Sequence, residues 1–242
     1  MAQWYDGWMG QDGSYHHQEI AIPGVLSALE LQPGEKVLDL GCGQGVLFEK
    51  VAEAGCEYVG VDASPGLIDI AKQRHGKSGK FLLGDVTKLA RLTELEAGSF
   101  DAAVFLLSLQ DMQDLKAALF NAITMLKPSG RLVLLLTHPA FRIQRQSGWG
   151  MDEGRKLQYR RVDSYMSEMT IPLKSYPGKQ GVSKTYHRPL QSYFAALQAS
   201  GAVVDSLTEL TAEALLTPQT SRTERRAVQE IPLYLCLRAK KK

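Results

Sequence analysis

The chain has 242 residues, of which 44% are hydrophobic and 22% charged, and its formal net charge is +2. This composition excludes a disordered or fibrous protein, and the near-neutral charge excludes a uniformly basic protein that coats nucleic acid. No apolar run approaches the roughly 20 residues that span a bilayer. The three scattered cysteines, without a CxxC pair, indicate a reducing compartment. We therefore expect a cytoplasmic protein without a membrane-spanning segment.

Predicted strands and helices alternate along the first 137 residues. Short apolar runs predict strands at 37–40, 58–61, 81–83, 100–107 and 131–137. Helical periodicity predicts helices at 20–29, 46–54, 66–74, 86–92 and 111–126. Strands that alternate with helices of this length need crossover connections. The sequence therefore predicts an α/β fold whose sheet is mostly parallel and has helices on both faces.

The alternation stops after residue 137. The following segment, up to residue 188, is rich in glycine, proline and aromatic residues and has no sustained period. A long irregular segment inside a compact domain is typically a functional lid or binding surface. A helix at 189–200 and strands at 202–207 and 233–237 complete the predicted elements. We expect a single domain with a helical cap (1–35), a binding core (36–138), an inserted lid (139–188) and a final helix and strand pair (189–242).

A glycine-rich loop follows the first predicted strand. Gly41, Gly43 and Gly45 stand between this strand and the next predicted helix. Glycines at such a position allow a tight turn and a close approach of ligand to backbone, and the helix N-terminus favours an anionic group. A dinucleotide-binding fingerprint, GxGxxG, would need its third glycine at position 46, which is Val46. The spacing therefore disfavours a dinucleotide.

The loop and four later segments resemble the motifs of class I S-adenosylmethionine-dependent methyltransferases of the small, free-standing bacterial type. These segments are 37–45 (VLDLGCGQG), 59–64 (VGVDAS), 83–86 (LGDV), 100–104 (FDAAV) and 126–132 (LKPSGRL). The resemblance implies a Rossmann-like, seven-stranded sheet with the last strand antiparallel. It also implies S-adenosyl-L-methionine as cofactor and S-adenosyl-L-homocysteine as product.

The resemblance assigns cofactor contacts residue by residue. Asp62 would bind the ribose hydroxyls, Asp85 the adenine amino group, and Asp39 the methionine part. The full set implied by the motifs is Asp39, Gly41, Cys42, Gly43, Gly45, Asp62, Ala63, Gly84, Asp85, Val86, Leu106 and Leu107. The N-terminal segment adds Tyr15 and His17 if it folds over the cofactor, or packs on the sheet edge if it does not. The alternative for the strand-end carboxylates is a capping role at the next helix.

Methyl transfer is an in-line displacement that mainly requires alignment of the acceptor and exclusion of water. We expect the acceptor beyond the ends of the fourth and fifth strands, near 106–111 and 137–139. His138 and His187 are the candidate general bases, although His138 can instead bond a loop backbone. The candidate substrate contacts are Tyr165, Tyr176 and Arg188. No cluster with metal-ligand spacing is visible, so we expect no metal.

The leading hypothesis is methyl transfer to an oxygen or nitrogen atom of a small molecule, for which an anionic or aromatic acceptor is the candidate. Residues 142–190 hold ten basic and four acidic side chains interleaved with aromatic ones. Such a segment can close over a planar small molecule or stack on bases. An RNA methyltransferase acting on transfer RNA is therefore an alternative, although nucleic acid is the less favoured partner. A non-catalytic sensor of the cofactor or its product is the third hypothesis.

Overall fold

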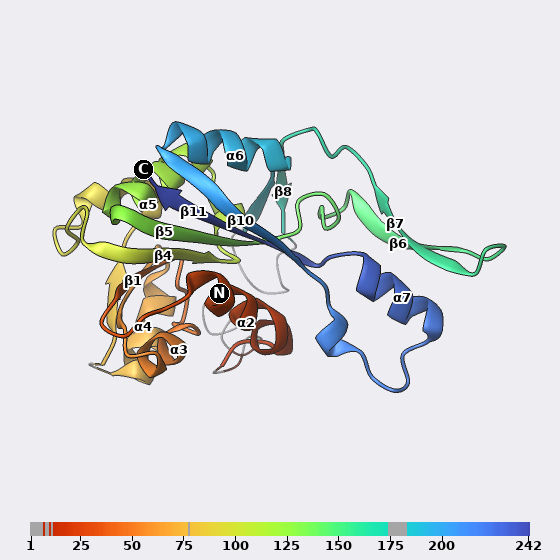
Figure 1. The fold of residues 1–242 in the computed structure, drawn as a ribbon, viewed down its shortest axis with the longest axis horizontal. Helices are drawn as coiled ribbons and strands as arrows, with labels where there is room; N and C mark the ends of the chain where they lie inside the picture. Colours follow the sequence, from red (N-terminus) through yellow and green to blue (C-terminus); the bar gives the residue numbers. More distant parts are fainter. Residues whose placement is uncertain (1–6, 8–9, 11, 77, 174–182) are drawn as a thin grey trace.

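The computed structural model describes residues 7, 10, 12–76, 78–173 and 183–242. Seven strands form one sheet in the spatial order β10-β11-β5-β4-β1-β2-β3 (Figure 1). They are β1 (Lys36–Leu40), β2 (Glu57–Asp62), β3 (Lys80–Leu83), β4 (Phe100–Leu106), β5 (Leu126–Thr137), β10 (Ala202–Leu210) and β11 (Tyr234–Lys241). Strands β1 to β5 pair in parallel, whereas β11 runs antiparallel to both β5 and β10. The predicted Rossmann-like sheet with an antiparallel last strand is confirmed.

Helices cover both faces of the sheet, as predicted (Figure 1). The cluster on one face includes Leu29, Phe48 and Ile68, and the cluster on the other includes Leu119 and Leu197. The helices of the first face are η1 (His17–Ala21), α2 (Ile22–Leu29), α3 (Phe48–Glu53) and α4 (Pro65–His75). Those of the second face are η2 (Val86–Arg91), α5 (Leu115–Met125) and α6 (Leu190–Ala199). The central strands are buried on both faces, which explains their continuous apolar sequences.

The segment after β4 differs from its prediction. The sequence predicts one helix over 111–126, but the structure has a short 3-10 turn, η3 (Leu109–Asp111), before α5 begins at Leu115. The side chain of Asp114 caps α5 by accepting a hydrogen bond of 2.9 Å from the Ala117 backbone. An N-cap residue has non-helical dihedral angles. The cap therefore separates η3 from α5, and η3 lies at the edge of the sheet.

The irregular segment contains two antiparallel hairpins that its sequence does not reveal. The first joins β6 (Ser147–Asp152) to β7 (Leu157–Val162), and the second joins β8 (Met169–Pro172) to β9 (Lys184–His187). The first hairpin extends away from the sheet beside α7 (Arg222–Glu230), which follows the 3-10 turn η4 (Glu213–Leu215) (Figure 1). Half-exposed strands show no strong alternation of apolar and polar residues, so the sequence pattern does not predict these strands and their structure depends on backbone pairing.

Among the described residues, no helix is long and apolar enough to cross a membrane.

Candidate functional site

The glycine loop wraps over the end of the neighbouring strand. Gly41 and Cys42 both donate backbone hydrogen bonds to the Val61 carbonyl, at 2.8 and 3.1 Å. Gly41 and Gly43 have φ angles of +76° and +56°, a region that favours glycine. A Cβ added to Gly43 would meet no atom of the described residues within 4 Å, so these residues leave the space above it open. The loop therefore presents bare backbone toward this open space.

Asp62, at the end of β2, binds the same loop. Its Oδ2 accepts a hydrogen bond from the Gly43 backbone at 2.9 Å, and its Oδ1 accepts one from the Ser64 backbone at 2.8 Å. Each carboxylate oxygen has a further lone pair after these bonds. Asp62 is partly accessible, and the adjacent Ala63 is exposed. The carboxylate is thus held in place and keeps capacity to accept two hydrogen bonds from a vicinal diol.

Asp39 lies buried beneath the loop. Its Oδ2 accepts a hydrogen bond of 2.8 Å from the Tyr58 hydroxyl, whereas Oδ1 has no hydrogen-bond partner among the described residues. Burial raises the pKa of this carboxyl to about 7, although the Tyr58 hydrogen bond lowers it in part. A buried carboxylate oxygen without a partner costs folding free energy unless a cation or a hydrogen-bond donor binds it. The site therefore suits a positively charged or hydrogen-bond-donating ligand.

A small cavity of about 30 Å³ brings six of the predicted cofactor residues together. They are His17, Asp39, Gly41, Cys42, Gly43 and Leu106. Gln44 also lines it, and its buried Oε1 has no hydrogen-bond partner among the described residues. The cavity is much smaller than a nucleoside, so it can hold only one end of such a ligand. The remainder would lie along the accessible ends of β2 and β3.

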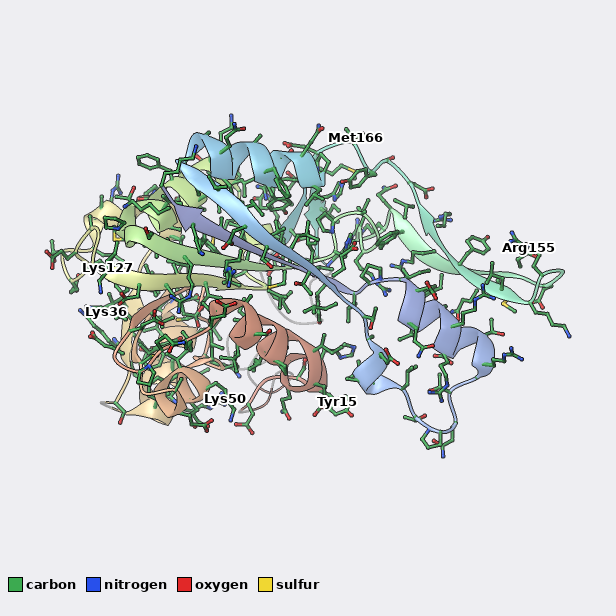
Figure 2. The ribbon with its side chains drawn as sticks, in the orientation of Figure 1. Tyr15, Lys36, Lys50, Lys127, Arg155 and Met166 are labelled. Atoms are coloured by element: carbon green, nitrogen blue, oxygen red, sulfur yellow. The ribbon has the colours of Figure 1, made fainter. Side chains whose placement is uncertain are left out.

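The N-terminal segment contributes one of its two predicted residues to this cavity. His17 is buried, its Nδ1 lies 2.9 Å from the Ser14 hydroxyl, and burial lowers its pKa to about 4. His17 is thus neutral at physiological pH. Tyr15 is 59% exposed and lies at the outer edge of the molecule (Figure 2). The structure therefore brings His17, and not Tyr15, to the glycine loop.

The third predicted motif lies at the end of β3. The Asp85 carboxylate accepts hydrogen bonds from the Thr87 backbone at 2.9 Å and the Thr87 hydroxyl at 2.6 Å, and pairs with Lys88 at 2.9 Å. The hydrogen bond from the Thr87 hydroxyl is the main cause of the lowered pKa of Asp85. Asp85 therefore caps η2, which was the alternative noted for it. This geometry does not test its contact with adenine, which stays a prediction.

The remaining motif residues shape the backbone and its packing around the site. Gly84 donates a hydrogen bond of 2.9 Å to the Asp62 carbonyl, and Val86 is buried. A Cβ on Gly45 would lie 2.9 Å from the Phe81 ring, so this glycine permits close packing of loop and strand. Leu107 has a φ angle of +53°, an uncommon conformation for a branched residue. It turns the chain sharply between β4 and η3.

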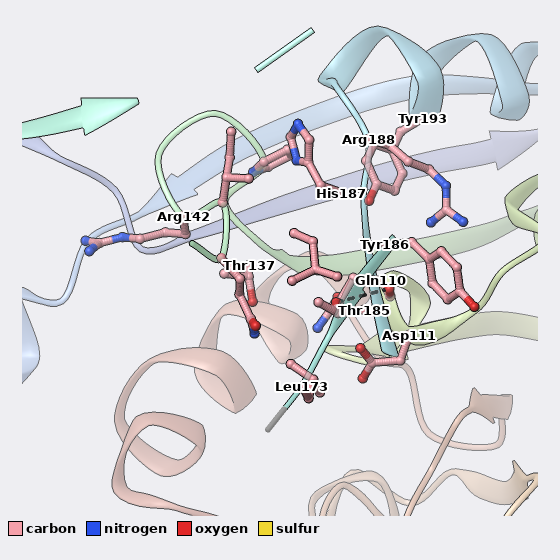
Figure 3. Close-up of a pocket in the computed structure, with 14 residues that line it drawn as sticks. Gln110, Asp111, Thr137, Arg142, Leu173, Thr185, Tyr186, His187, Arg188 and Tyr193 are labelled. Carbon is pink, nitrogen blue, oxygen red and sulfur yellow. Dashed lines mark hydrogen bonds between the residues drawn. The ribbon is translucent and has the colours of Figure 1, made fainter. Parts of the chain in front are cut away.

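A second cavity, of about 170 Å³, lies beyond the ends of β4 and β5 (Figure 3). Its lining includes Gln110 and Asp111 from η3, Thr137 at the end of β5, and residues of β8, β9 and α6. Leu106 lines the first cavity and Gln110 the second, so the β4 end lies between them. A cavity of about 150 Å³ accommodates benzene. The second cavity can therefore hold a molecule with one ring.

Two predicted substrate or catalytic residues line this second cavity. His187 lines the cavity, and its Nε2 donates a hydrogen bond of 2.7 Å to the Tyr165 carbonyl. Arg188 is buried, and its Nη2 donates to the carbonyls of Met112 and Gln113, both at 2.7 Å. Arg188 thus ties β9 to the loop after η3. Its Nη1 has no hydrogen-bond partner among the described residues.

The other predicted residues lie outside this cavity. His138 is buried, with Nε2 2.8 Å from Glu209 and Nδ1 accepting a bond of 3.2 Å from the Ala140 backbone. Burial lowers its pKa, and both ring nitrogens are engaged. Tyr165 accepts a hydrogen bond of 2.9 Å from the Leu190 backbone and so positions the start of α6. Tyr176 lies outside the described residues. The catalytic and substrate roles of these residues stay predictions.

Asp111 is the acidic residue of the second cavity, and the sequence placed it near the acceptor without a role. It is solvent-exposed on the cavity wall, but surrounding protein desolvates the carboxylate and raises its pKa to about 6. The Thr185 hydroxyl lowers this pKa in part. The only sequence signal was its position after the fourth strand. No group of three or more potential metal ligands occurs in the described part of the chain.

Comparisons with known proteins agree with this geometry. Residues 38–134 match the family model described as a methyltransferase domain. A demethylmenaquinone methyltransferase of Renibacterium salmoninarum is 34% identical over 118 residues, 48% of each chain. A ubiquinone biosynthesis O-methyltransferase of Xanthomonas axonopodis pv. citri is 31% identical over 132 residues, 54% of this chain and 55% of the relative. The chain thus spans about half the length of these curated relatives.

A solved structure is similar along nearly the whole chain. The S-adenosylmethionine-dependent methyltransferase of Mesorhizobium loti superposes with a TM-score of 0.74 and 26% identity. The superposition covers 96% of this chain and 100% of that protein. It therefore includes segments outside the matched family model, among them the segment between β5 and α6.

Proposed function

We propose that this chain, which contains a class I S-adenosylmethionine-dependent methyltransferase domain, transfers a methyl group to an oxygen or nitrogen atom of a small molecule. The observation that carries the proposal is the pair of neighbouring cavities at the carboxyl edge of the sheet. One lies under the glycine loop beside the unpaired Asp39 carboxylate, and the other has room for a single ring. Their separation by the end of β4 allows two ligands to approach each other there.

The residues present fit the cofactor. The buried Oδ1 of Asp39 and Oε1 of Gln44 lack partners among the described residues, and both can accept hydrogen bonds from the cofactor's ammonium group. The open space at Gly43 admits the ligand, and Asp62 offers two acceptors to the ribose hydroxyls. When bound, S-adenosyl-L-methionine supplies an electrophilic methyl group on a sulfonium. Around it, the protein aligns the acceptor and excludes water.

A small-molecule acceptor agrees best with the second cavity. Its volume suits one ring, and its walls combine apolar side chains such as Ile143 and Ile171 with Tyr186 and Tyr193. The curated relatives are named for demethylmenaquinone and for ubiquinone biosynthesis, which supports a small-molecule acceptor. Transfer RNA is the second candidate because the guanidinium carbons of Arg142 and Arg160 lie 5.1 and 5.2 Å from the ring centroid of the exposed Trp149. Aromatic and basic groups of this kind can bind single-stranded bases.

Calorimetric titration with S-adenosyl-L-methionine and, separately, with NADH tests the cofactor assignment. We expect binding of the former and at least tenfold weaker binding by an Asp62→Ala variant, because both ribose acceptors are removed. An Asp69→Ala variant, altered at an exposed residue of α4, is the matched control. Preferential binding of NADH would contradict the proposal.

Radiolabelled methyl transfer separates the three functional hypotheses. A labelled product from a protein-free metabolite extract would support a small-molecule methyltransferase. Label in transfer RNA, with binding that weakens steeply as salt increases, would favour the RNA hypothesis. Cofactor binding without label in either fraction would favour the sensor and would refute catalysis.

A further inference from the structure

We propose that Asp111 is the general base of this site and accepts the proton of a hydroxyl group on the acceptor. The inference rests on the proposed function and specifies its substrate class, because a base is needed only where the acceptor atom must lose a proton during transfer. A hydroxyl with a high pKa is such an acceptor, whereas an ionised or tertiary group is not.

The structure fixes the backbone of Asp111 through hydrogen bonds to two distant segments. The Ser108 hydroxyl donates a hydrogen bond of 2.6 Å to the Leu40 carbonyl, which joins the start of η3 to the end of β1. The Thr185 hydroxyl of β9 donates to the Gln110 carbonyl at 3.3 Å (Figure 3). The two Arg188 hydrogen bonds hold the backbone just after η3. The position of Asp111 is therefore determined by two distant segments of the chain, the end of β1 and residues 185–188.

The carboxylate itself is left available. No ion pair between Asp111 and a basic side chain occurs among the described residues. Its side chain is exposed and lines the second cavity, close to the end of β4 that separates this cavity from the glycine loop. A carboxylate used only for structure would be expected to bind a cation or a helix end, as Asp85 does. Asp111 instead interacts with the Thr185 hydroxyl, a neutral group, and keeps further acceptor capacity for a ligand.

The other ionisable groups of the cavity are less suited to accept this proton. Arg142 and Arg188 are cations, and burial raises the pKa of the Tyr193 hydroxyl. Tyr186 is a phenol whose ring packs against the Arg188 guanidinium. His187 donates a hydrogen bond from Nε2 to the Tyr165 carbonyl, and this bond fixes the orientation of the ring and ties β9 to Tyr165. Asp111 is the only carboxylic acid in the described lining.

The ionisation of Asp111 suits this role. Desolvation raises its pKa to about 6, so the group is mostly ionised at pH 7.5 yet is a stronger base than an ordinary aspartate. As its proton passes to Asp111, the acceptor oxygen forms a bond to the methyl carbon with its electron pair. The electron pair of the breaking carbon–sulfur bond stays on sulfur and neutralises its positive charge. The products are a methyl ether, the thioether and a protonated Asp111, which is exposed and can return its proton to water.

Two phenols that differ in acidity test the inference. Phenol resembles the tyrosine side chain, with a pKa near 10, whereas 4-nitrophenol is largely ionised at pH 8 and needs no base. We expect Asp111→Asn to lower tritiated methyl transfer to phenol by roughly 100-fold, and transfer to 4-nitrophenol by less than about threefold. Asp69→Asn makes the same chemical change on α4, away from both cavities, and should leave both rates unchanged.

The pH profile is a second readout that a structural role would not alter in the same way. For wild type, kcat/KM toward phenol should rise through the pKa of Asp111 near pH 6 and then level off. The rise should be absent in Asp111→Asn. Equal losses on both phenols, or an unchanged inflection near pH 6 in the variant, would overturn the assignment of the base.

Calorimetry distinguishes failure of this inference from failure of the proposed function. If S-adenosyl-L-methionine binds but wild type methylates neither phenol, the hydroxyl class is refuted, while methyl transfer to other acceptors remains testable with the extract. If S-adenosyl-L-methionine does not bind, the proposed function itself fails. Unchanged cofactor affinity in Asp111→Asn would show that the variant is folded.

Discussion

Gly43 offers a direct test of the cofactor-binding geometry through a Gly43→Ala substitution. Its φ angle of +56° places alanine in the left-handed region, at a cost of about 1 kcal/mol of folding free energy. The new Cβ would meet no atom within 4 Å among the residues that the structure describes, so they add no steric cost to this strain. It would, however, project into the open space at the loop, where backbone and ligand approach closely. We therefore expect a small loss of stability and a large loss of cofactor affinity.

Gly34 provides the matched control. It has a φ angle of +87°, and its added Cβ would also meet no atom within 4 Å in the described part of the chain. It precedes β1, whereas Gly43 follows that strand. Urea unfolding of Gly34→Ala and Gly43→Ala should give similar losses of about 1 kcal/mol. Titration with S-adenosyl-L-methionine should show wild-type affinity for Gly34→Ala and at least tenfold weaker binding for Gly43→Ala. Equal affinities of the two variants would refute the assignment of the ligand to this loop.

Four further substitutions test the surroundings of the site and the packing of the sheet. Gly41→Ala places a Cβ 2.5 Å from Cβ of Ser108, so urea unfolding should show a loss about 1–3 kcal/mol larger than that of Gly43→Ala; an equal loss would contradict the packing. Tyr58→Phe removes the hydrogen bond that lowers the Asp39 pKa, so the ionised carboxylate should form only at higher pH. The pH at which cofactor affinity is half-maximal should then move upward from near 7, and an unchanged or lower midpoint would argue against Asp39 as a ligand. Arg131→Met removes a paired guanidinium that binds Glu35 and the Leu29 carbonyl, and should cost about 2 kcal/mol in thermal or urea unfolding. Lys127→Met breaks a half-exposed pair with Asp101 and should cost less than about 1 kcal/mol.

The sequence by itself determined the sheet and the glycine loop. Apolar strands, turn residues and the spacing of Gly41, Gly43 and Gly45 are properties of neighbouring residues, and local backbone preference with parallel pairing then leaves few topologies. The resemblance to class I methyltransferases rested on the same contiguous segments, and residues 38–134 match the family model described as a methyltransferase domain. The approach of Asp39 and Asp62 to one loop likewise follows from their places in β1 and β2.

The tertiary structure alone decided the chemistry around the second cavity. His138 is engaged by Glu209, which is 71 residues away, and Asp111 is exposed to a cavity partly walled by residues about 75 positions later. Of the two hairpins, only β8–β9 contributes described residues to the lining of this cavity, and its sequence carries no sustained period. Hydrogen-bond partners and desolvation depend on which distant segments meet. For this reason the order of strands could be predicted from local pattern, whereas the availability of a base could not.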